Sequence, residues 1–493
     1  MSALDLGIIL VYMAVMVLIG IACRGKQENE SDYFTGHGGF SRFWGSVLVG
    51  LSIAATFFSG ISMLAYPSIA YQKGIVVLMA AVVLSAAGLL TYQWFLPRFL
   101  RTGTREPYEI VERRFGYSTR VLMAVMFLLL RVSWIGTLIY APTIALMGGF
   151  GLEQKWFWGI VLGIGLTSTF YTVFGGIRGV IVTDAIQFLV IVAGILWPVV
   201  TVLLRLNLGG STVWNFLRES GRLDSFSFSL SPTEPLTFWS MLFGFLVANL
   251  GMYLADQMAL QRYLASEDLR AARKAFLFNI CGVVIVVTLL VVMGISLVLF
   301  YGTVKPGQAP LSADEIFPRF IATELPPGVP GLIFAAILAA TMSSMTSGTN
   351  ALAGTIVLDF LARSPHFSGS KRRLKTARLL SLGIGLVATL AAGVIGRLGS
   401  IFDIAQALTG VFLGPMLVCM VLSVSSLQVS RIAVQAGMLL GVVSGWGIIL
   451  TPADRLWVGP VALLASLIIP AGSLLWQMSF HAAEAVSAAV REP

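Results

Sequence analysis

Residues 335–350 read Ala-Ala-Ile-Leu-Ala-Ala-Thr-Met-Ser-Ser-Met-Thr-Ser-Gly-Thr-Asn and form the second half of an apolar segment. At about 100° per helical residue, one set of positions falls within roughly 160° of one face: Ala340, Ser343, Ser344, Thr346, Ser347 and Asn350. The result is an oxygen-rich stripe on a helix otherwise suited to lipid. Lipid cannot satisfy these hydroxyls, so a membrane protein must bury the stripe against another helix or give it a ligand.

The composition of the chain indicates a polytopic, all-α membrane protein. Of its 493 residues 57% are hydrophobic and 11% are charged, whereas a soluble domain carries about 25% charged residues. The net charge of +9 does not indicate nucleic acid, because Lys and Arg concentrate in alternate loops, above all 98–120 and 363–378. This distribution follows the positive-inside rule. It predicts an extracytoplasmic N-terminus, a cytoplasmic C-terminus and a place in the cytoplasmic (inner or plasma) membrane.

Hydropathy predicts thirteen transmembrane helices. We expect them at about 4–23, 43–66, 74–97, 121–147, 156–174, 180–204, 237–255, 275–300, 326–361, 378–396, 399–425, 431–450 and 456–477. The first is read as a retained helix, because the apolar run that ends at Cys23 has no convincing cleavage site. The loops 205–236 and 301–325 are predicted to be extracytoplasmic, and residues 106–116 to form a short amphipathic cytoplasmic helix.

Two of the predicted spans carry glycines that suggest a break. The second has Gly60 at its middle and Pro67 near its end, and the seventh has Gly244 and Gly251 around Asn249. The two lie five spans apart, which predicts two inverted five-helix repeats, 43–204 and 237–425. Residues 1–23 then form an extra N-terminal helix, 431–477 two C-terminal helices, and 478–493 a cytoplasmic tail. Close helix packing is the alternative explanation of the glycines.

The stripe has the chemistry of a sodium site. Sodium is a hard cation that needs several oxygen ligands, which hydroxyls and unwound backbone carbonyls supply. Ser343 and Ser344, with the Ala340 carbonyl, face one way, and the broken second span offers carbonyls around Ala55 and Phe58. Hydrogen bonding between helices is the alternative role for these serines.

Two intramembrane charges are further candidates. Asp184, in the sixth span, is expected to supply the negative charge of a second site with Ser343, Thr346 and Ser347, or else to pair with Arg178. Arg131, inside the fourth span, costs about 3 kcal/mol unless it faces water, an acid or a ligand. A salt bridge or helix-end snorkel and a clamp for an anionic solute are equally open interpretations of it.

Several motifs occur together in an order that resembles the sodium/solute symporter family. They are Tyr-Phe-Thr-Gly at 33–36, the broken second span, Gly-Gly-Ile-Arg…Thr-Asp-Ala-Ile-Gln at 175–187, Asp-Gln…Gln-Arg-Tyr-Leu at 256–264 and the Ser343-Ser344 segment. The resemblance covers about residues 4–477. It implies the inverted-repeat fold of amino-acid and sugar symporters, with one extra helix before the ten-helix core and two after it.

The resemblance also implies roles for particular residues. The general sodium site of the family corresponds to Ala55, Phe58, Ala340, Ser343 and Ser344, and the additional site of some members to Asp184, Ser343, Thr346 and Ser347. Two sodium ions per cycle are therefore expected. Positions that contact solute correspond to Ser59, Ser62, Asn249 and Gln406, and Arg131 resembles the arginine that holds the carboxylate in sialic-acid-type members.

Other positions depart from the family pattern. Met252 stands where sugar transporters place an inner-gate tyrosine, although Tyr253 is adjacent, and Val77 and Ala81 are apolar where sialic-acid carriers are aromatic and polar. These departures argue against galactose, whereas Arg131 favours sodium-coupled uptake of a small organic solute that carries a carboxylate, sialic acid or another organic anion. A neutral solute (sugar or amino acid) and proton coupling through Asp184 are the alternatives. No obligatory protein partner is evident.

A membrane enzyme or a solute sensor is not favoured by the sequence. The three histidines, His37, His366 and His481, are far apart, and the three cysteines show no paired spacing. The chain ends about 16 residues after its last predicted span, without the signalling domain that a sensor of this fold usually carries. No catalytic residues are therefore assigned.

Overall fold

The computed structural model describes residues 2–23, 33–34, 42–206, 209–223, 226–307, 313–363, 370–395 and 401–491, and these are helical apart from short connections. The helices are α1 (Ala3–Ala22), α3 (Arg42–Phe57), α4 (Gly60–Lys73), η1 (Gly74–Leu78), α5 (Met79–Leu90), η2 (Thr91–Phe95), α6 (Leu96–Arg101), α7 (Glu109–Phe115), α8 (Tyr117–Phe150), η3 (Gln154–Trp156), α9 (Phe157–Leu206), α10 (Gly210–Glu219), α11 (Phe238–Leu254), α12 (Gln257–Leu264), α13 (Leu269–Leu299), η4 (Phe300–Val304), α14 (Ala313–Glu324), α15 (Val329–Gly354), η5 (Thr355–Phe360), η6 (Leu361–Arg363), α16 (Ser370–Ile395), α17 (Ile401–Val424), α18 (Arg431–Ile449), η8 (Arg455–Trp457) and α19 (Val458–Arg491).

The expectation of an all-helical membrane protein is confirmed, but the count of thirteen spans is not. Among the described residues, ten helices are long and apolar enough to cross a membrane, or eleven if the bent pair α11 and α12 is one span. The difference arises because two long helical runs, 60–101 and 154–206, are each counted as one span. The second run contains two of the predicted spans, and the helix before the first run is too short to count by itself. Gly176, with φ 56° and ψ −158°, breaks the second run inside α9, a backbone conformation that favours glycine.

One predicted break is present beside its glycine, whereas the other prediction is wrong, because α11 is continuous from Phe238 to Leu254 through Gly244 and Gly251. The second span divides between α3 and α4 at Phe58 and Ser59. The seventh span bends by 45° between α11 and α12, after Leu254. This bend lies C-terminal to Gly244 and Gly251. A Cβ on either glycine would lie 2.6 Å from an atom of the neighbouring Leu456 or Leu413. These two glycines therefore serve close helix packing, the alternative explanation of the pattern.

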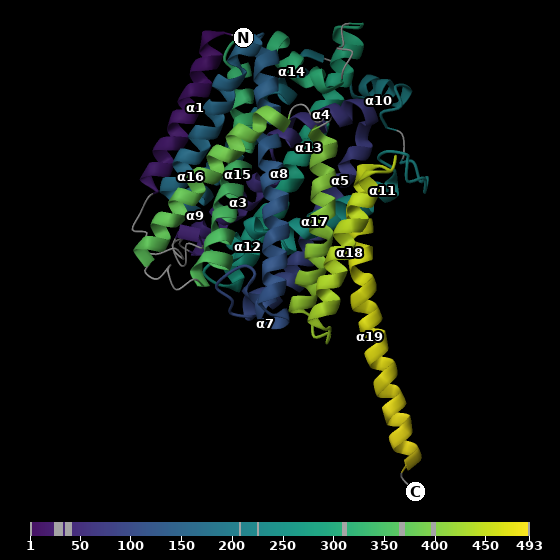
Figure 1. Ribbon diagram of the computed structural model, residues 1–493. Coiled ribbons are helices and arrows are strands. Elements are labelled where there is room, and N and C mark those ends of the chain that lie inside the picture. The colour runs from purple at the N-terminus through teal and green to yellow at the C-terminus, as the bar shows by residue number, and fades with distance from the viewer. Residues whose placement is uncertain are drawn as a thin grey trace.

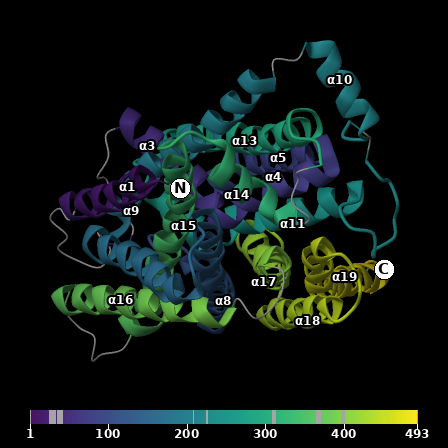
Figure 2. The same cartoon turned by 90° about the horizontal axis from the view of Figure 1, so that it is seen from above.

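The helix that carries the stripe, α15, lies at the centre of the molecule. In its most apolar window 89% of the residues are buried, compared with 28% for α1. It contacts α1, α3, α4, α8, α9 and α16, and Figure 2 shows it enclosed by other helices, with α17, α18 and α19 grouped to one side. The stripe is therefore not one face of a lipid-exposed helix, because every face of α15 packs against protein.

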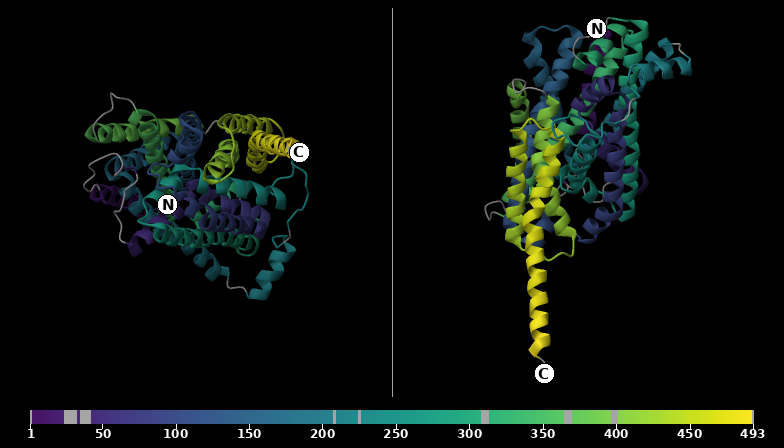
Figure 3. Two further views of the ribbon diagram at one scale, coloured as in Figure 1. Left: turned by 90° about the horizontal axis from the view of Figure 1, so that it is seen from below. Right: turned by 90° about the vertical axis from the view of Figure 1, so that its right-hand side faces the viewer.

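The two ends of the helix bundle differ in what they carry (Figure 1). The N-terminus lies at the same end as α10 and α14, and this end is called the N-terminal end below. The predicted amphipathic helix is present as α7, which lies at the opposite end, called the α7 end. The long helix α19 extends beyond the rest of the bundle in that direction (Figure 3). The two chain termini therefore lie at opposite ends of the bundle.

Candidate functional site

The break of the second span exposes backbone carbonyls in the interior of the protein. The last carbonyls of a helix have no partner within the helix, and α3 ends at Phe57. The Ala55 carbonyl accepts from the Phe58 amide at 3.2 Å, beyond the end of α3. Ser59 starts α4 as its N-cap, with its side chain accepting from the Ser62 amide at 3.3 Å. A short polar segment therefore interrupts an otherwise apolar span.

Two serines of the α15 stripe point at this break. The Ser343 hydroxyl donates to the carbonyls of Ala55 and Ala340, each at 3.1 Å. The Ser344 hydroxyl lies 3.2 Å from the Phe58 carbonyl and equally close to that of Thr56. Ser343 and Ser344 are fully buried. The structure thus brings together all five residues predicted for the first sodium site, on helices that are almost 300 residues apart in the chain.

Gly60 allows this close approach between α4 and α15. A Cβ at this position would lie 2.2 Å from Thr341 Oγ1 and 3.3 Å from the Ile337 carbonyl oxygen. Neither atom leaves room for a side chain, so the glycine noted in the sequence has a steric reason. It keeps the start of α4 against the polar part of α15.

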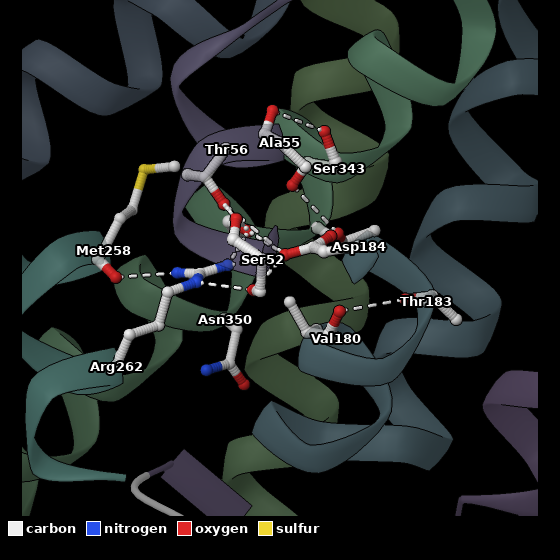
Figure 4. Close-up of polar contacts among 12 residues, drawn as sticks. Ser52, Ala55, Thr56, Val180, Thr183, Asp184, Met258, Arg262, Ser343 and Asn350 are labelled. Atoms are coloured by element: carbon white, nitrogen blue, oxygen red, sulfur yellow. Dashed lines mark hydrogen bonds and ion pairs between the residues drawn. The ribbon is translucent and has the colours of Figure 1, made fainter. Parts of the chain in front are cut away.

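The other edge of the stripe faces Asp184, as predicted for the second site (Figure 4). The Ser347 hydroxyl lies 3.3 Å from Asp184 Oδ2, and the Thr346 hydroxyl donates to the Ser343 carbonyl at 3.1 Å. Asp184 is fully buried within α9. Of the three hydroxyls expected at this site, that of Ser347 is the one that contacts Asp184 among the described contacts; the carboxylate belongs to α9 and the hydroxyls to α15.

The partner of Asp184 is Arg262, which the sequence analysis did not single out. Its guanidinium lies 2.7 Å from Asp184 Oδ2 and is fully buried. Arg178, the alternative partner considered from the sequence, does not take this place in the described structure. Arg262 belongs to the Gln-Arg-Tyr-Leu motif at 261–264, which hydropathy assigned to a loop, whereas the structure buries it in α12.

Arg131 forms an ion pair with Asp256, the N-cap residue of α12, and both side chains are buried. The guanidinium also lies over the ring of Trp134, 4.8 Å from the ring centroid. Of the two interpretations left open by the sequence, the structure displays the salt bridge. In this arrangement the positive charge already has a protein carboxylate as its partner.

The other residues predicted to contact solute lie at the start of α4, in α11 and in α17. Ser59 and Ser62 lie next to each other at the start of α4, with their hydroxyls 3.3 Å apart. Asn249 donates to the Phe245 carbonyl of its own helix at 2.7 Å. The side chain of Gln406 lies outside the described residues. Tyr253, adjacent to the predicted gate position, is fully buried and stacks near Phe57, with ring centroids 4.5 Å apart.

A cluster of charges at the α7 end was also missed by sequence reasoning; it is called the Arg120 cluster. Arg120 of α8 pairs with Glu106, Glu112 and Asp359, and Gln257 donates to Asp359 at 3.0 Å. These residues come from the 102–116 segment, α8, α12 and η5. Arg120 is 2% exposed. Hydropathy assigns it to a loop and therefore does not reveal that it is a buried ion-pair partner.

The surroundings of Glu112 in this cluster lower its pKa. Its partial burial alone would raise the pKa, but hydrogen bonds from Arg363 and Arg120 outweigh burial and hold the pKa of Glu112 below its ordinary value. The carboxylate therefore stabilises the folded state in its charged form.

Comparison with known proteins identifies the family. A model of the sodium:solute symporter family matches residues 33–445. The chain belongs to this family. One relative, the sodium-coupled monocarboxylate transporter 2 of Danio rerio, is 30% identical over 373 residues, 75% of this chain and 59% of the relative. The human sodium/iodide cotransporter is 29% identical, covering 99% of this chain and 74% of its own. The sodium/sialic acid symporter SiaT of Proteus mirabilis is 28% identical over 82% and 81%.

Solved structures confirm the fold. The outward-open, substrate-bound structure of a sodium-coupled sialic acid symporter superposes with a TM-score of 0.86 at 24% identity, covering 96% of this chain and 98% of that one. Mhp1, a nucleobase-cation-symport-1 family transporter, gives 0.53 at 14% identity over 87% and 92%. The fold is thus that of sodium symporters. The family consists of membrane transporters, which excludes the membrane-enzyme interpretation.

Proposed function

We propose that the chain couples inward movement of sodium to uptake of a small solute, and that a sodium ion binds between α15 and the break of the α3–α4 span. The observation that carries this proposal is the position of the Ser343 and Ser344 hydroxyls, 3.1–3.2 Å from carbonyls of Ala55 and Phe58. When sodium binds, the two hydroxyl groups would rotate so that their protons point away from the carbonyls. The hydroxyl and carbonyl oxygens would then all face the ion. The C-terminal end of α3 adds a favourable helix dipole.

This position also gives a mechanism for coupling. In the proposed repeats 43–204 and 237–425, α3 belongs to the first and α15 to the second. An ion that binds oxygens of both favours the conformation in which they are close. Solute binding near Ser59 and Ser62 on the adjacent α4 is then strengthened by sodium, and by reciprocity solute strengthens sodium binding.

For the solute we propose an anion, and a carboxylate in particular. The relatives reported above are named for monocarboxylate, iodide and sialic acid, all of which are anions. Arg131 stays the proposed carboxylate contact, with Asn249 and Gln406 as further contacts, although its present partner is Asp256. The second candidate function is transport of a neutral sugar or amino acid. Such a solute could bind while Arg131 stays paired with Asp256.

We further propose up to two sodium ions per cycle, the second at Asp184, Ser343, Thr346 and Ser347. The Ser347 hydroxyl contacts Asp184, and Arg262 pairs with the same carboxylate. Two sodium ions with a monoanion would move one net positive charge inward. Each such charge is driven by about 2.3 kcal/mol per 100 mV of membrane potential.

The proposed membrane arrangement has thirteen spans, an extracytoplasmic N-terminus and a cytoplasmic C-terminus in the cytoplasmic membrane. Counting α3 with α4 and α11 with α12, and dividing the long runs at Gly74 (φ 75°) and Gly176 (φ 56°), gives this number. The Arg-rich 98–120 segment then lies on the cytoplasmic side with the α7 end, as the positive-inside rule requires.

Titration calorimetry in sodium or in potassium tests the proposal. Purified protein is titrated with short monocarboxylates, sialic acid, iodide, sugars and amino acids. We expect an anionic ligand whose affinity rises in sodium. Equal affinity in both cations would overturn sodium coupling, and uptake into proteoliposomes that persists without sodium under a pH gradient would favour proton coupling through Asp184.

A further inference from the structure

A positively charged side chain of the protein lies among the groups proposed for the second sodium ion. The guanidinium of Arg262 contacts Asp184 Oδ2 at 2.7 Å, Ser52 Oγ at 2.8 Å and the Ser347 hydroxyl (Figure 4). Asp184 and Ser347 are two of the four residues proposed for the second ion. Arg262 comes from α12, whereas these partners come from α3, α9 and α15.

The single negative charge of Asp184 can balance the charge of only one cation. Its Oδ2 atom accepts from Arg262 and from the hydroxyls of Ser52 and Ser347, at 2.7 to 3.3 Å. Its Oδ1 atom is buried and has no hydrogen-bond partner among the described residues. Arg262 is the only group of opposite charge paired with this acid in the described part of the chain. The pair is therefore neutral as it stands.

We propose that Arg262 is a tethered cation that competes with the second sodium ion for Asp184. The inference rests on the proposed second site. One buried carboxylate with both a guanidinium and a sodium ion would leave a net positive charge in a low-dielectric interior, which is strongly unfavourable. Sodium therefore binds at Asp184 only after Arg262 has left, and with the arginine in place the protein holds one ion, at Ser343 and Ser344.

The departure of Arg262 requires movement of α12. The guanidinium donates to the Met258 carbonyl of its own helix at 2.7 Å, which fixes the side chain relative to α12. The helix is short, bends by 45° from α11 and packs on α3, α6 and α15. Its first residue is preceded by Asp256, the partner of Arg131. Exchange of Arg262 for sodium thus connects the number of bound ions to the position of α12 and to the Arg131–Asp256 pair.

Equilibrium binding of radioactive sodium to the purified protein in nanodiscs tests the proposal. In wild type we expect one ion per protein at low sodium and a second only at high sodium. Arg262→Gln removes the competing charge, so we expect the second ion to bind about tenfold more tightly or better. The Hill coefficient of sodium-driven uptake, where uptake survives, should move from about 1 toward 2. Unchanged stoichiometry and affinity in folded Arg262→Gln would overturn the inference.

Two further variants make the result specific. Arg120→Gln removes another buried arginine, in the Arg120 cluster, and should leave sodium binding at wild-type stoichiometry; a gained ion there would overturn the assignment to Arg262. The double variant Asp184→Asn/Arg262→Gln should lose the gained ion, and its retention would place that ion elsewhere. Loss of the first ion in Ser344→Ala tests the proposed function separately, because Ser344 does not contact Asp184 or Arg262 among the described contacts.

A measurement on wild type keeps the proposal testable even where Arg262→Gln does not fold. Hydrogen exchange of residues 257–264 is compared at low and high sodium, with potassium balancing the ionic strength. Release of Arg262 should increase exchange in α12 at high sodium. Equal exchange, at concentrations where two ions are bound, would overturn the competition.

Discussion

Removal of the Ser343 hydroxyl is the most direct test of the sodium site, because this residue belongs to both proposed sites. In Ser343→Ala the Ala55 carbonyl loses a donor at 3.1 Å but keeps the Phe58 amide at 3.2 Å, so the helix break survives. The loss of one hydrogen bond between neutral groups costs about 1 kcal/mol of folding free energy. An oxygen that contacts an ion is worth about 1.5–3 kcal/mol, which predicts a 10- to 150-fold higher sodium concentration for half-maximal uptake.

The assay is solute uptake into proteoliposomes as a function of external sodium, together with the melting temperature in sodium and in potassium. The matched control is Ser168→Ala, which removes an equally buried hydroxyl that donates to Ile164 within its own helix at 2.8 Å. The control should retain the sodium dependence of wild type. The reasoning is refuted if folded Ser343→Ala keeps the wild-type sodium dependence, or if Ser168→Ala shifts it as much.

Three further changes probe other parts of the site. Asp256→Asn frees the Arg131 guanidinium, so an anionic solute held there should bind more tightly in Asp256→Asn and lose most affinity in Arg131→Ala, measured by calorimetry. Gly60→Ala places a Cβ 2.2 Å from Thr341 Oγ1; such overpacking costs about 1–3 kcal/mol and should lower both the melting temperature and sodium affinity. The pKa of Glu112 lies below the ordinary 4.5, so its contribution to stability is complete above that pH and lost as pH falls through the lower folded value; the melting temperature of Glu112→Gln should therefore fall less on acidification.

Each of these changes has an outcome that would contradict it. Weaker solute binding in both Asp256→Asn and Arg131→Ala would show that the ion pair itself supports the site and that the solute does not replace Asp256. Gly163→Ala is the control for Gly60, because no atom lies within 4 Å of its Cβ; equal loss of stability in both would exclude the steric argument. Parallel acid curves for Glu112→Gln and wild type would remove Glu112 from the pH dependence.

The contact between α15 and the break after α3 was predictable from the sequence, because both segments carry local signals. Gly60 marks the break within the second span, and the row of hydroxyls marks the polar face of α15. In the structure Ser343 and Ser344 contact carbonyls at that break. The break after Leu254 was located less well. The glycines of that span serve packing against Leu413 and Leu456, and a packing glycine and a hinge glycine have the same appearance in a sequence.

The buried ion pairs could not be predicted, because hydropathy sorts charges by their neighbours along the chain. Arg262 and Arg120 lie beside polar residues and were therefore counted as loop charges, yet both are 1–2% exposed. Arg131 stood out because its neighbours are apolar, but its partner Asp256 lies more than 100 residues away. Pairing of this kind depends on tertiary packing. The acids have no common position in the sequence pattern: Asp184 lies inside a predicted span, whereas Asp256 directly follows one.

The position of α3 explains why the two proposed sites cannot act independently. Ser52 of this helix contacts both Asp184 and Arg262, and Ala55, one turn later, contacts Ser343. An ion at the proposed first site would hold the end of α3 against α15, and Arg262 in its present position holds the preceding turn against α9 and α12. If Arg262 withdrew, Ser52 would keep its hydrogen bond to Asp184 at 2.8 Å, and sodium at Asp184 would hold α9 without holding α12. The proposed exchange of Arg262 for sodium would therefore preserve the first site while it releases α12, so that a fixed ion site could coexist with a moving helix.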